Sequence, residues 1–163
     1  KFPGVSPLSM KHSKALFKSM KAILDPRLLI FAFHKDRPIA FFIMIPDINP
    51  IIKKFNGKLN LINKLRLMYD LKVLKKTKRA LGLIFGVVPE FQGKNITDGM
   101  ISFMEDELGK GTHYTDLEMN WIGDFNPKMM NMVKALNPDI KKVHITYRYL
   151  FDREKEFTRA KII

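Results

Sequence analysis

Apolar residues gather into three runs in the first 88 residues of the chain, each with the length of a β-strand. The first two runs, 28–33 and 39–45, are rich in Phe and Ile. The polar link 34–38 between them predicts a hairpin. The third run, 80–88, is apolar almost throughout and ends at Pro89, which cannot donate to a β-ladder. We expect this third strand to be covered on both faces.

Alternating polar and apolar residues predict two more strands further along the chain, at 112–122 and 143–151. In the first of these, Trp121 is expected to lie in the core. In the second, one core-facing side is expected to carry Val143, Ile145, Tyr147, Tyr149 and Phe151.

Apolar residues spaced three and four apart predict amphipathic helices between the strands. The predicted helices cover 10–24, 48–55, 59–74, 96–108 and 127–136. In the third helix the residues expected to face inward, opposite a basic face, are Leu61, Leu65, Met68, Leu71 and Leu74. In the fourth helix the expected inward stripe is Ile96, Met100, Phe103, Met104 and Leu108.

This order predicts an α/β (α+β) fold in which helices flank a mixed central sheet, because the hairpin makes two strands antiparallel. A helical insert at about 48–78 interrupts the strands. We expect residues 10–152 to form the domain, with a lead-in at 1–9 and a charged tail at 153–163.

Charge narrows the choice of partners. The net charge is +13, and the basic residues crowd the segment 53–79, where Asp70 is the one acid. This pattern favours anionic partners, although a solvated basic face explains it equally well. The chain has no cysteine, which excludes disulfides and a Cys nucleophile, and its four histidines lack the spacing of a zinc site, so no metal is expected.

Targeting signals are also informative. The most apolar region, 28–45, is interrupted by charged residues, so no membrane span is expected. No signal peptide is visible, and we expect a cytoplasmic protein. Because the sequence begins at Lys1, we expect it to be a piece of a longer chain, with an upstream domain as one candidate partner.

The polar turn 90–95 joins the third apolar run to a helix and contains Gly93 and Lys94. A strand, a Gly-containing turn and a helix N-terminus form a favourable place for an anion, because backbone N–H groups point outward there. The alternative is an ordinary strand-to-helix connection with a solvated lysine, which such a short signal does not exclude.

The segment Val88–Ile96 resembles the acyl-CoA loop of the GNAT N-acetyltransferases, whose motif runs Val-x-Pro-x-x-Arg/Gln-Gly-x-Gly-x-Gly/Ala. Gln92, Gly93 and Lys94 match this motif. Asn95 and Thr97 stand where the family has small residues, and Asn tolerates left-handed backbone angles better than most residues.

The resemblance extends over about 11–152 and is greater to a bacterial GNAT-like group of longer proteins, which carry this half at their C-terminus. The segments that carry it are 46–49, 55–59, 86–94 and 118–126. The first GNAT strand has no counterpart here, which fits an N-terminal truncation.

The resemblance implies an N-acyltransferase that uses acetyl-CoA or another acyl-CoA and an unidentified amine acceptor. It implies cofactor-binding roles for Phe85, Gly86, Val87, Val88, Gln92, Gly93, Lys94, Asn95, Ile96, Thr97 and Asn126. The catalytic candidates are Glu118 as general base, with Asp116 as a second choice, and Tyr149 or Tyr147 as the acid that protonates the thiolate. For these carboxylates a salt-bridged role, and for these tyrosines a packing role, are the alternatives.

Two other functions fit the sequence. One is a GNAT-fold module that has lost catalysis and serves another domain or partner. The other is a nucleic-acid or anionic-membrane binder that uses the basic segment 53–79, although no specific nucleic-acid motif supports it.

Overall fold

The computed structural model describes residues 9–156, which divide into two units, 9–120 and 121–156. Each unit is described by itself. Residues 1–8 of the predicted lead-in (1–9) and residues 157–163 of the predicted tail (153–163) lie outside the described residues.

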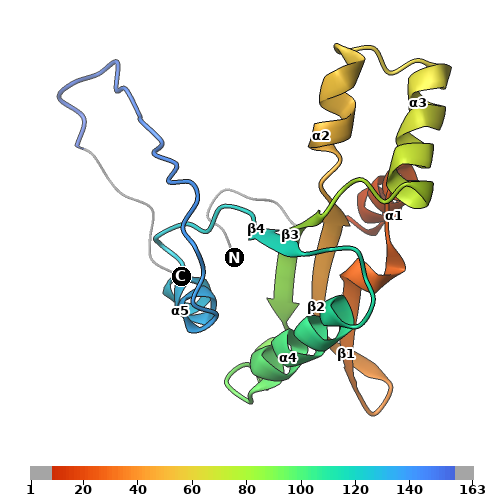
Figure 1. Cartoon of the computed structure of the whole chain (residues 1–163). Helices are drawn as coiled ribbons and strands as arrows, with labels where there is room; N and C mark the ends of the chain where they lie inside the picture. Colours follow the sequence, from red (N-terminus) through yellow and green to blue (C-terminus); the bar gives the residue numbers. More distant parts are fainter. Residues whose placement is uncertain (1–8, 157–163) are drawn as a thin grey trace. The chain divides into compact units, whose positions relative to one another are not determined.

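The larger unit is built on a four-stranded sheet with the strand order β1-β2-β3-β4 (Figure 1). The strands are β1 Leu29–His34, β2 Arg37–Pro46, β3 Arg79–Val87 and β4 Asp116–Met119. The pairs β1–β2 and β2–β3 are antiparallel, and β3–β4 is parallel. The predicted mixed sheet is therefore confirmed, although β4 is shorter than the predicted strand at 112–122.

The predicted hairpin closes through a two-residue turn. Lys35 and Asp36 have φ angles of 46° and 62°, and His34 is paired with Arg37. Left-handed angles at both turn residues match the right-handed twist of the flanking strands.

A β-bulge at Leu83 changes the register of β3. Ile84 pairs with Ile43 of β2, but the next pair joins Gly82 to Met44, so Leu83 is an extra residue. As a result, Ala80 and Gly82 before the bulge face the same side of the sheet as the residues 85 and 87 that follow it. The strand is less covered than predicted, because Ile84 is half exposed on the other face.

Helix α4 covers one face of the sheet, and the helices α2 and α3 extend from one end of it (Figure 1). The helices of this unit are α1 Met10–Met20, α2 Asn49–Ile52, α3 Leu61–Met68 and α4 Ile96–Gly109. The short helical turns are η1 Pro26–Leu28, η2 Lys53–Phe55, the π-turn η3 Tyr69–Val73 and η4 Pro89–Phe91. The predicted helical insert is confirmed as α2, η2, α3 and η3, which lie between β2 and β3 in the chain.

The main core lies between the sheet and α4. Its buried members include Leu28, Ile30, Ala40, Phe42, Met44, Ala80, Met100, Met104 and Tyr114. The glycine at position 82 is required here, because a Cβ would lie 2.9 Å from the Sδ of Met119 and 3.2 Å from the ring of Phe42. Ile96 and Leu108 also pack on this core as predicted, but Phe103 is exposed, so its predicted inward position was wrong.

A second, smaller core holds the helical insert together. It consists of Ile51, Phe55, Leu67 and Leu71. Beside it the Asp70 carboxylate is buried and accepts a 2.6 Å hydrogen bond from the Nζ of Lys76. This pair satisfies a buried charge that would otherwise be costly.

The predicted inward stripe of α3 was largely wrong. Leu71 is buried, but Leu61, Leu65 and Leu74 are exposed, and Leu67 takes the inward position instead. Leucines occur on several sides of this helix, so spacing alone did not identify the side that contacts α2 and η2.

The unit 121–156 contains one helix, α5 Pro127–Ala135, and the Asn126 side chain accepts a hydrogen bond of 3.2 Å from the N–H of Met129. The predicted strand at 143–151 was wrong, because this segment is irregular and its predicted core-facing residues are exposed. Trp121 is also exposed rather than in the core. An alternating pattern forms a strand only beside another strand, and none is formed within the described part of this unit.

Candidate active site at the end of β3

The turn that follows β3 is fixed by backbone hydrogen bonds. The N–H of Val88 donates to the carbonyl of Ile39 on β2 at 2.9 Å, which extends the ladder by one residue. The N–H of Phe91 then donates to the carbonyl of Val88 at 2.9 Å and closes η4. The chain therefore leaves the sheet in a tight turn and is directed toward the start of α4.

Two residues in this turn adopt left-handed backbone angles. Gly93 has φ +74°, and a Cβ built on it meets no atom within 4 Å. Asn95 has φ 56° and is the N-cap residue of α4, yet its side chain makes no capping hydrogen bond. Left-handed residues in a turn help to direct backbone N–H groups to one side, which is a feature of anion-binding nests.

The first turn of α4 adds to this nest. Helix N-termini expose unpaired N–H groups and carry a partial positive charge. Thr97, one of the residues that differ from the GNAT motif, is half-buried in this turn. The side chain of Asn95 makes no capping hydrogen bond, so it does not compete with an anion for the amides of this turn.

Side chains brace the turn from both sides. The Nε2 of Gln92 donates to the carbonyl of Val87 at 3.1 Å, which ties the turn to the end of β3. The Nζ of Lys94 lies 5.2 Å from the centre of the Phe91 ring. The turn is therefore ordered by its own side chains before any ligand is considered.

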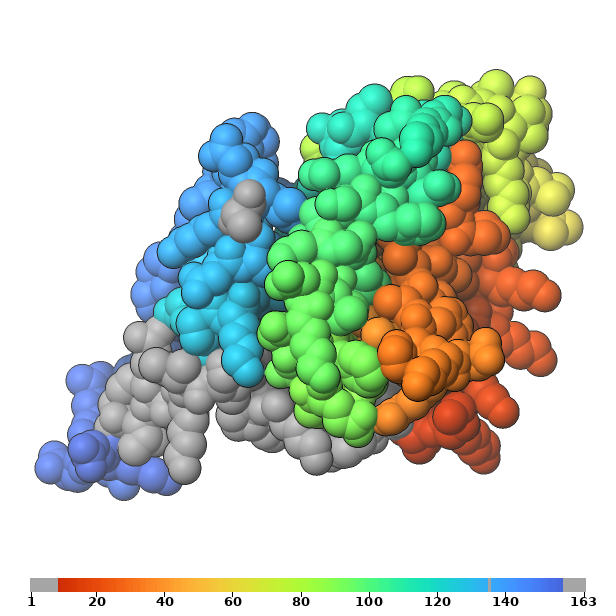
Figure 2. Space-filling model, turned by 90° about the horizontal axis from the view of Figure 1, so that it is seen from below, coloured from red at the N-terminus to blue at the C-terminus, as the bar shows by residue number. Residues whose placement is uncertain are grey.

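The hairpin between β1 and β2 also supports the turn. Arg37 pairs with Glu90 at 3.1 Å, and the His34 ring lies 5.5 Å from the ring of Phe91. Figure 2 shows this end of the unit, with the hairpin (orange) beside the segment that contains the turn and α4 (green).

Strands β3 and β4 separate before β3 reaches this turn. Their pairing ends at Gly82 and Met119, and the N–H of Asn120 makes a last hydrogen bond of 3.1 Å to the carbonyl of Gly82. Strand β3 continues to Val87, with Phe85 and Gly86 paired to β2 on one side. On its other side, no strand pairs with residues 83–87 within the described part of this unit. This open strand edge is where the resemblance predicted exposed backbone groups.

Glu118 lies on β4, just before the point of separation. Its neighbours Leu117 and Met119 pack on the core under α4, so Glu118 faces the opposite side of the sheet. Its Oε2 lies 2.7 Å from the Nη1 of Arg79, and its side chain is about one quarter exposed. Asp116, the other candidate base, is exposed on the same face and accepts a hydrogen bond from Thr115.

The last two predicted site residues, Asn126 and Tyr149, belong to the unit 121–156. Asn126 uses its side-chain oxygen to cap α5. Tyr149 is exposed, and its hydroxyl accepts a hydrogen bond of 2.9 Å from Arg153. Its predicted core-facing position was therefore wrong. Of the predicted site residues, those of β3, the turn, α4 and β4 therefore belong to one unit.

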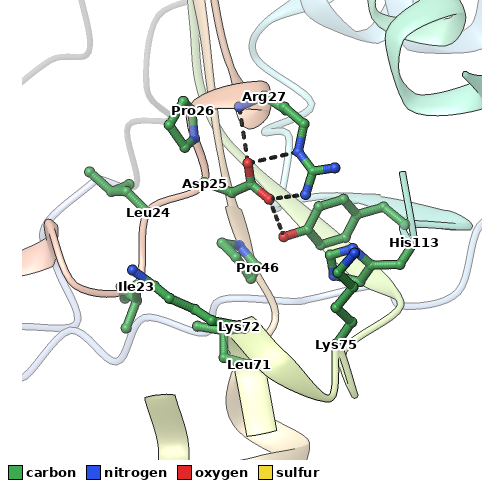
Figure 3. Close-up of a pocket in the computed structure, with 11 residues that line it drawn as sticks. Ile23, Leu24, Asp25, Pro26, Arg27, Pro46, Leu71, Lys72, Lys75 and His113 are labelled. Carbon is green, nitrogen blue, oxygen red and sulfur yellow. Dashed lines mark hydrogen bonds and ion pairs between the residues drawn. The ribbon is translucent and has the colours of Figure 1, made fainter. Parts of the chain in front are cut away.

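Sequence reasoning missed a pocket at the other end of the sheet (Figure 3). It has a volume of about 230 Å³ and is lined by residues that include Asp25, Arg27, His113 and Tyr114. Arg27 donates to Asp25 at 2.7 Å and the Tyr114 hydroxyl donates to it at 3.1 Å. These residues precede β1 and β4, whereas the turn at Gly93 follows the end of β3.

The charge states in this pocket follow from burial and hydrogen bonding. Burial alone would raise the pKa of Asp25, but hydrogen bonds from Arg27 and Tyr114 outweigh it and lower that pKa. Burial and the Asp25 carboxylate raise the pKa of the Tyr114 hydroxyl above its usual range. Burial, together with the positive charges of Arg27 and Lys75, lowers the pKa of His113, whose ring nitrogens are buried without a partner in the described structure. The pocket therefore holds a structural network that joins the starts of two strands.

Replacement of His113 with phenylalanine is expected to stabilise the protein by roughly 1 kcal/mol at neutral pH, because two unsatisfied nitrogens are removed. Because the pKa of His113 is lowered on folding, the native protein loses stability as the pH falls below the ordinary value of 6.5. The variant should not show this loss. Urea unfolding at about pH 7.5 and about pH 5.5 measures both effects.

The control for this experiment is His144→Phe, since His144 is exposed in the other unit. It should leave the urea midpoint unchanged. A His113→Phe variant that is less stable than the original protein at both pH values would contradict the interpretation of His113 as an unpartnered ring.

The chain was compared with known proteins by sequence and by structure. No protein-family model matches it. Over 148 residues, or 88% of this chain, it is 25% identical to the bacterial ceramide synthase of Caulobacter vibrioides (strain NA1000 / CB15N). It is 26% identical to Protein YghO of Escherichia coli (strain K12) over the same length. The chain spans 38% and 37% of the length of these two curated relatives.

Solved structures resemble it over most of its length. One is a protein of Agrobacterium tumefaciens str. C58 with a provisional assignment as an acetyltransferase, at a TM-score of 0.52 and 14% identity, covering 90% of this chain and 85% of that chain. Another is AAC(6')-Iy in complex with a CoA bisubstrate analogue, at a TM-score of 0.53 and 15% identity, covering 91% and 83%. The chain has the GNAT fold. The predicted fold class is therefore confirmed.

In the GNAT fold, β3 and β4 correspond to the two strands that separate. The turn with Gly93 lies where the resemblance predicted the acyl-CoA loop. Within the described residues, His, Asp and Glu side chains form no group suited to a metal ion. None of the described helices is long and apolar enough to cross a membrane.

Proposed function

We propose that this protein is an acyl-CoA-dependent N-acyltransferase. One observation carries the proposal: an uncapped helix N-terminus and two left-handed residues, Gly93 and Asn95, lie in the turn that follows β3, and the pairing of β3 with β4 has already ended at Gly82. This combination offers amides to a diphosphate and an open strand edge to an extended chain. Acyl-CoA contains both groups.

The residues of the turn fit such a ligand. Gly93 leaves open space above the backbone, so a diphosphate could approach without contact with a side chain. Backbone groups of 92–97 would bind the diphosphate, with Lys94 as a nearby positive charge, and Phe85–Val88 would contact the pantetheine arm. Support comes from the similar fold of AAC(6')-Iy, which was solved with a CoA bisubstrate analogue. The role of Asn126 in contacting the arm stays a prediction.

Catalysis requires the acceptor amine to lose a proton before its nitrogen attacks the thioester carbonyl. The C–N bond then forms, the C–S bond breaks, and the thiolate takes up a proton. We assign Glu118 as the base that takes this first proton, because it is a partly buried carboxylate whose Oε2 lies 2.7 Å from the Nη1 of Arg79. Tyr149 as the acid for the thiolate stays a prediction.

The acceptor is proposed to be the amine of an amino lipid. The support is the similarity to a bacterial ceramide synthase, because a ceramide is an amide formed from a long-chain amino alcohol. The proposed reaction of this chain is therefore amide formation between a fatty acyl-CoA and such an amine.

Isothermal titration calorimetry with acetyl-CoA, with a long-chain acyl-CoA and with free CoA tests the proposal. We expect saturable binding of all three, because the diphosphate and pantetheine are common to them. Absence of saturable binding would overturn the assignment. Binding without amide formation for any amine would instead support a GNAT module that has lost catalysis.

A further inference from the structure

An apolar surface on α3 and η3 remains exposed although the opposite side of the same helix is buried. Leu61, Ile62, Leu65 and Tyr69 are 72%, 74%, 63% and 54% exposed, and Val73 continues the row at 61%. Residues 61, 65, 69 and 73 are each four apart and follow one another along one side of the helical segment, with 62 beside them. These five residues are here called the α3 apolar face.

The α3 apolar face does not belong to the smaller core, because other residues of the same segment form that core. On the other side of the same helical segment, Leu67 and Leu71 are buried and pack against α2 and η2. The segment is therefore apolar on two sides: one side packs in the smaller core, and the other is exposed to solvent. Burial of five exposed apolar side chains would be strongly favourable, so this face is suited to a partner.

The insert that carries the α3 apolar face also carries many exposed basic side chains, three of which, Lys64, Arg66 and Lys72, belong to α3 and η3. The exposed lysines and arginine of the insert are Lys53, Lys54, Lys58, Lys64, Arg66, Lys72 and Lys75. The one acid of the segment 53–79, Asp70, is buried and paired with Lys76, so it does not offset the surface charge. A helix with aliphatic residues on one side and Lys and Arg around them is typical of helices that lie in a membrane interface.

We propose that the α3 apolar face is an interfacial docking surface for an anionic phospholipid bilayer. The aliphatic side chains enter the boundary between headgroups and acyl chains, and the basic residues contact the anionic headgroups. A second copy of this chain presenting the same face would oppose like charges, which disfavours self-association. Nucleic acid is disfavoured because four of the five residues are aliphatic and cannot stack on bases.

The position of this surface leaves the proposed acyl-CoA turn open. The insert joins the end of β2 to the start of β3, whereas the turn with Gly93 follows the end of β3 (Figure 1). The two features lie at opposite ends of one strand. A bilayer on the α3 apolar face would therefore hold the domain at the surface while a soluble acyl-CoA reaches the turn.

The test is co-sedimentation of the whole chain with vesicles of phosphatidylglycerol mixed with phosphatidylcholine, and with vesicles of phosphatidylcholine alone. We expect binding to the anionic vesicles and at least tenfold weaker binding to the neutral ones. The double variant Leu61→Glu with Leu65→Glu should weaken anionic binding at least tenfold, because both residues are exposed and two charges would have to enter the interface.

Two controls, Phe103→Glu and the calorimetry of acyl-CoA, separate docking from folding and from the proposed function, and a further variant, Lys58→Glu, tests the contribution of charge. Phe103→Glu places a charge on an exposed apolar residue of α4 and should leave vesicle binding unchanged. Lys58→Glu should weaken anionic binding more than tenfold, since one lysine is worth about a fivefold effect and the charge is reversed. Calorimetric binding of acyl-CoA should be unchanged in the Leu61→Glu, Leu65→Glu variant, so the two proposals fail separately.

Three results would overturn the docking proposal. The first is no sedimentation with anionic vesicles, and the second is equal loss in Phe103→Glu and in the double variant. The third is a concentration-dependent dimer, or a complex with duplex DNA, that the double variant removes while vesicle binding persists.

Discussion

A Gly93→Val variant is expected to lose binding of CoA and acyl-CoA by at least tenfold, or about 1.4 kcal/mol, while the chain still folds. Gly93 has φ +74°, an angle that β-branched residues rarely adopt. The turn must then either bear the strain or change its backbone angles, and a change would turn the amides away from the ligand. The added side chain would also fill the open space above the backbone. Calorimetry with free CoA measures the loss.

Gly57→Val is the matched control for this experiment. Gly57 has φ +75° and equally open surroundings, but it lies in the insert between η2 and α3. Both substitutions should reduce stability by a similar amount, about 1–3 kcal/mol for a strained left-handed residue. Only the change at Gly93 should affect the affinity for CoA. Equal affinity losses in the two variants, or none in either, would argue against the turn as the diphosphate site.

Glu118→Gln is expected to reduce kcat for amide formation by about 10²–10⁴-fold, the usual contribution of a general base. Glutamine keeps the shape of the side chain but cannot take a proton. The dissociation constant for CoA should not change, because Glu118 faces away from α4. Steady-state rates measured against pH should show that the variant has lost the acidic limb of the profile.

Asp116→Asn is the control on the same strand and the same face. It also removes a carboxylate, but its position precedes Glu118 and is farther from the point where β3 and β4 separate. We expect less than a threefold change in kcat. If the two variants lose activity equally, the carboxylates act through the charge of this face and Glu118 is not the base.

Local signals explain why most of the strands and helices could be predicted from the sequence. The hairpin follows from two apolar runs and a polar link, and α4 begins at Ile96 as the N-cap and apolar spacing indicate. The left-handed backbone angle at Asn95 could also be predicted, since Asn is the residue that best replaces glycine at such angles. These features depend on neighbours within a few residues.

Features that depend on distant partners were not predictable in the same way. On α3, leucines lie on several sides, and only contact with α2 decides that Leu67 and Leu71 are buried. The segment 143–151 alternates like a strand, but alternation supplies no partner strand. The Asp25–Tyr114 hydrogen bond joins residues 89 positions apart, and no spacing rule reports such a pair.

Because Leu83 is an extra residue in β3, the deletion of one residue from this strand would disturb the packing more than a conservative substitution would. Even-numbered residues (80 and 82) face α4 before the bulge, and odd-numbered residues (85 and 87) face α4 after it. A shortened β3 would keep its composition and hydrophobicity, yet it would move the Phe85 and Val87 side chains to the wrong side of the sheet. The number of residues in this strand is thus as constrained as their identity.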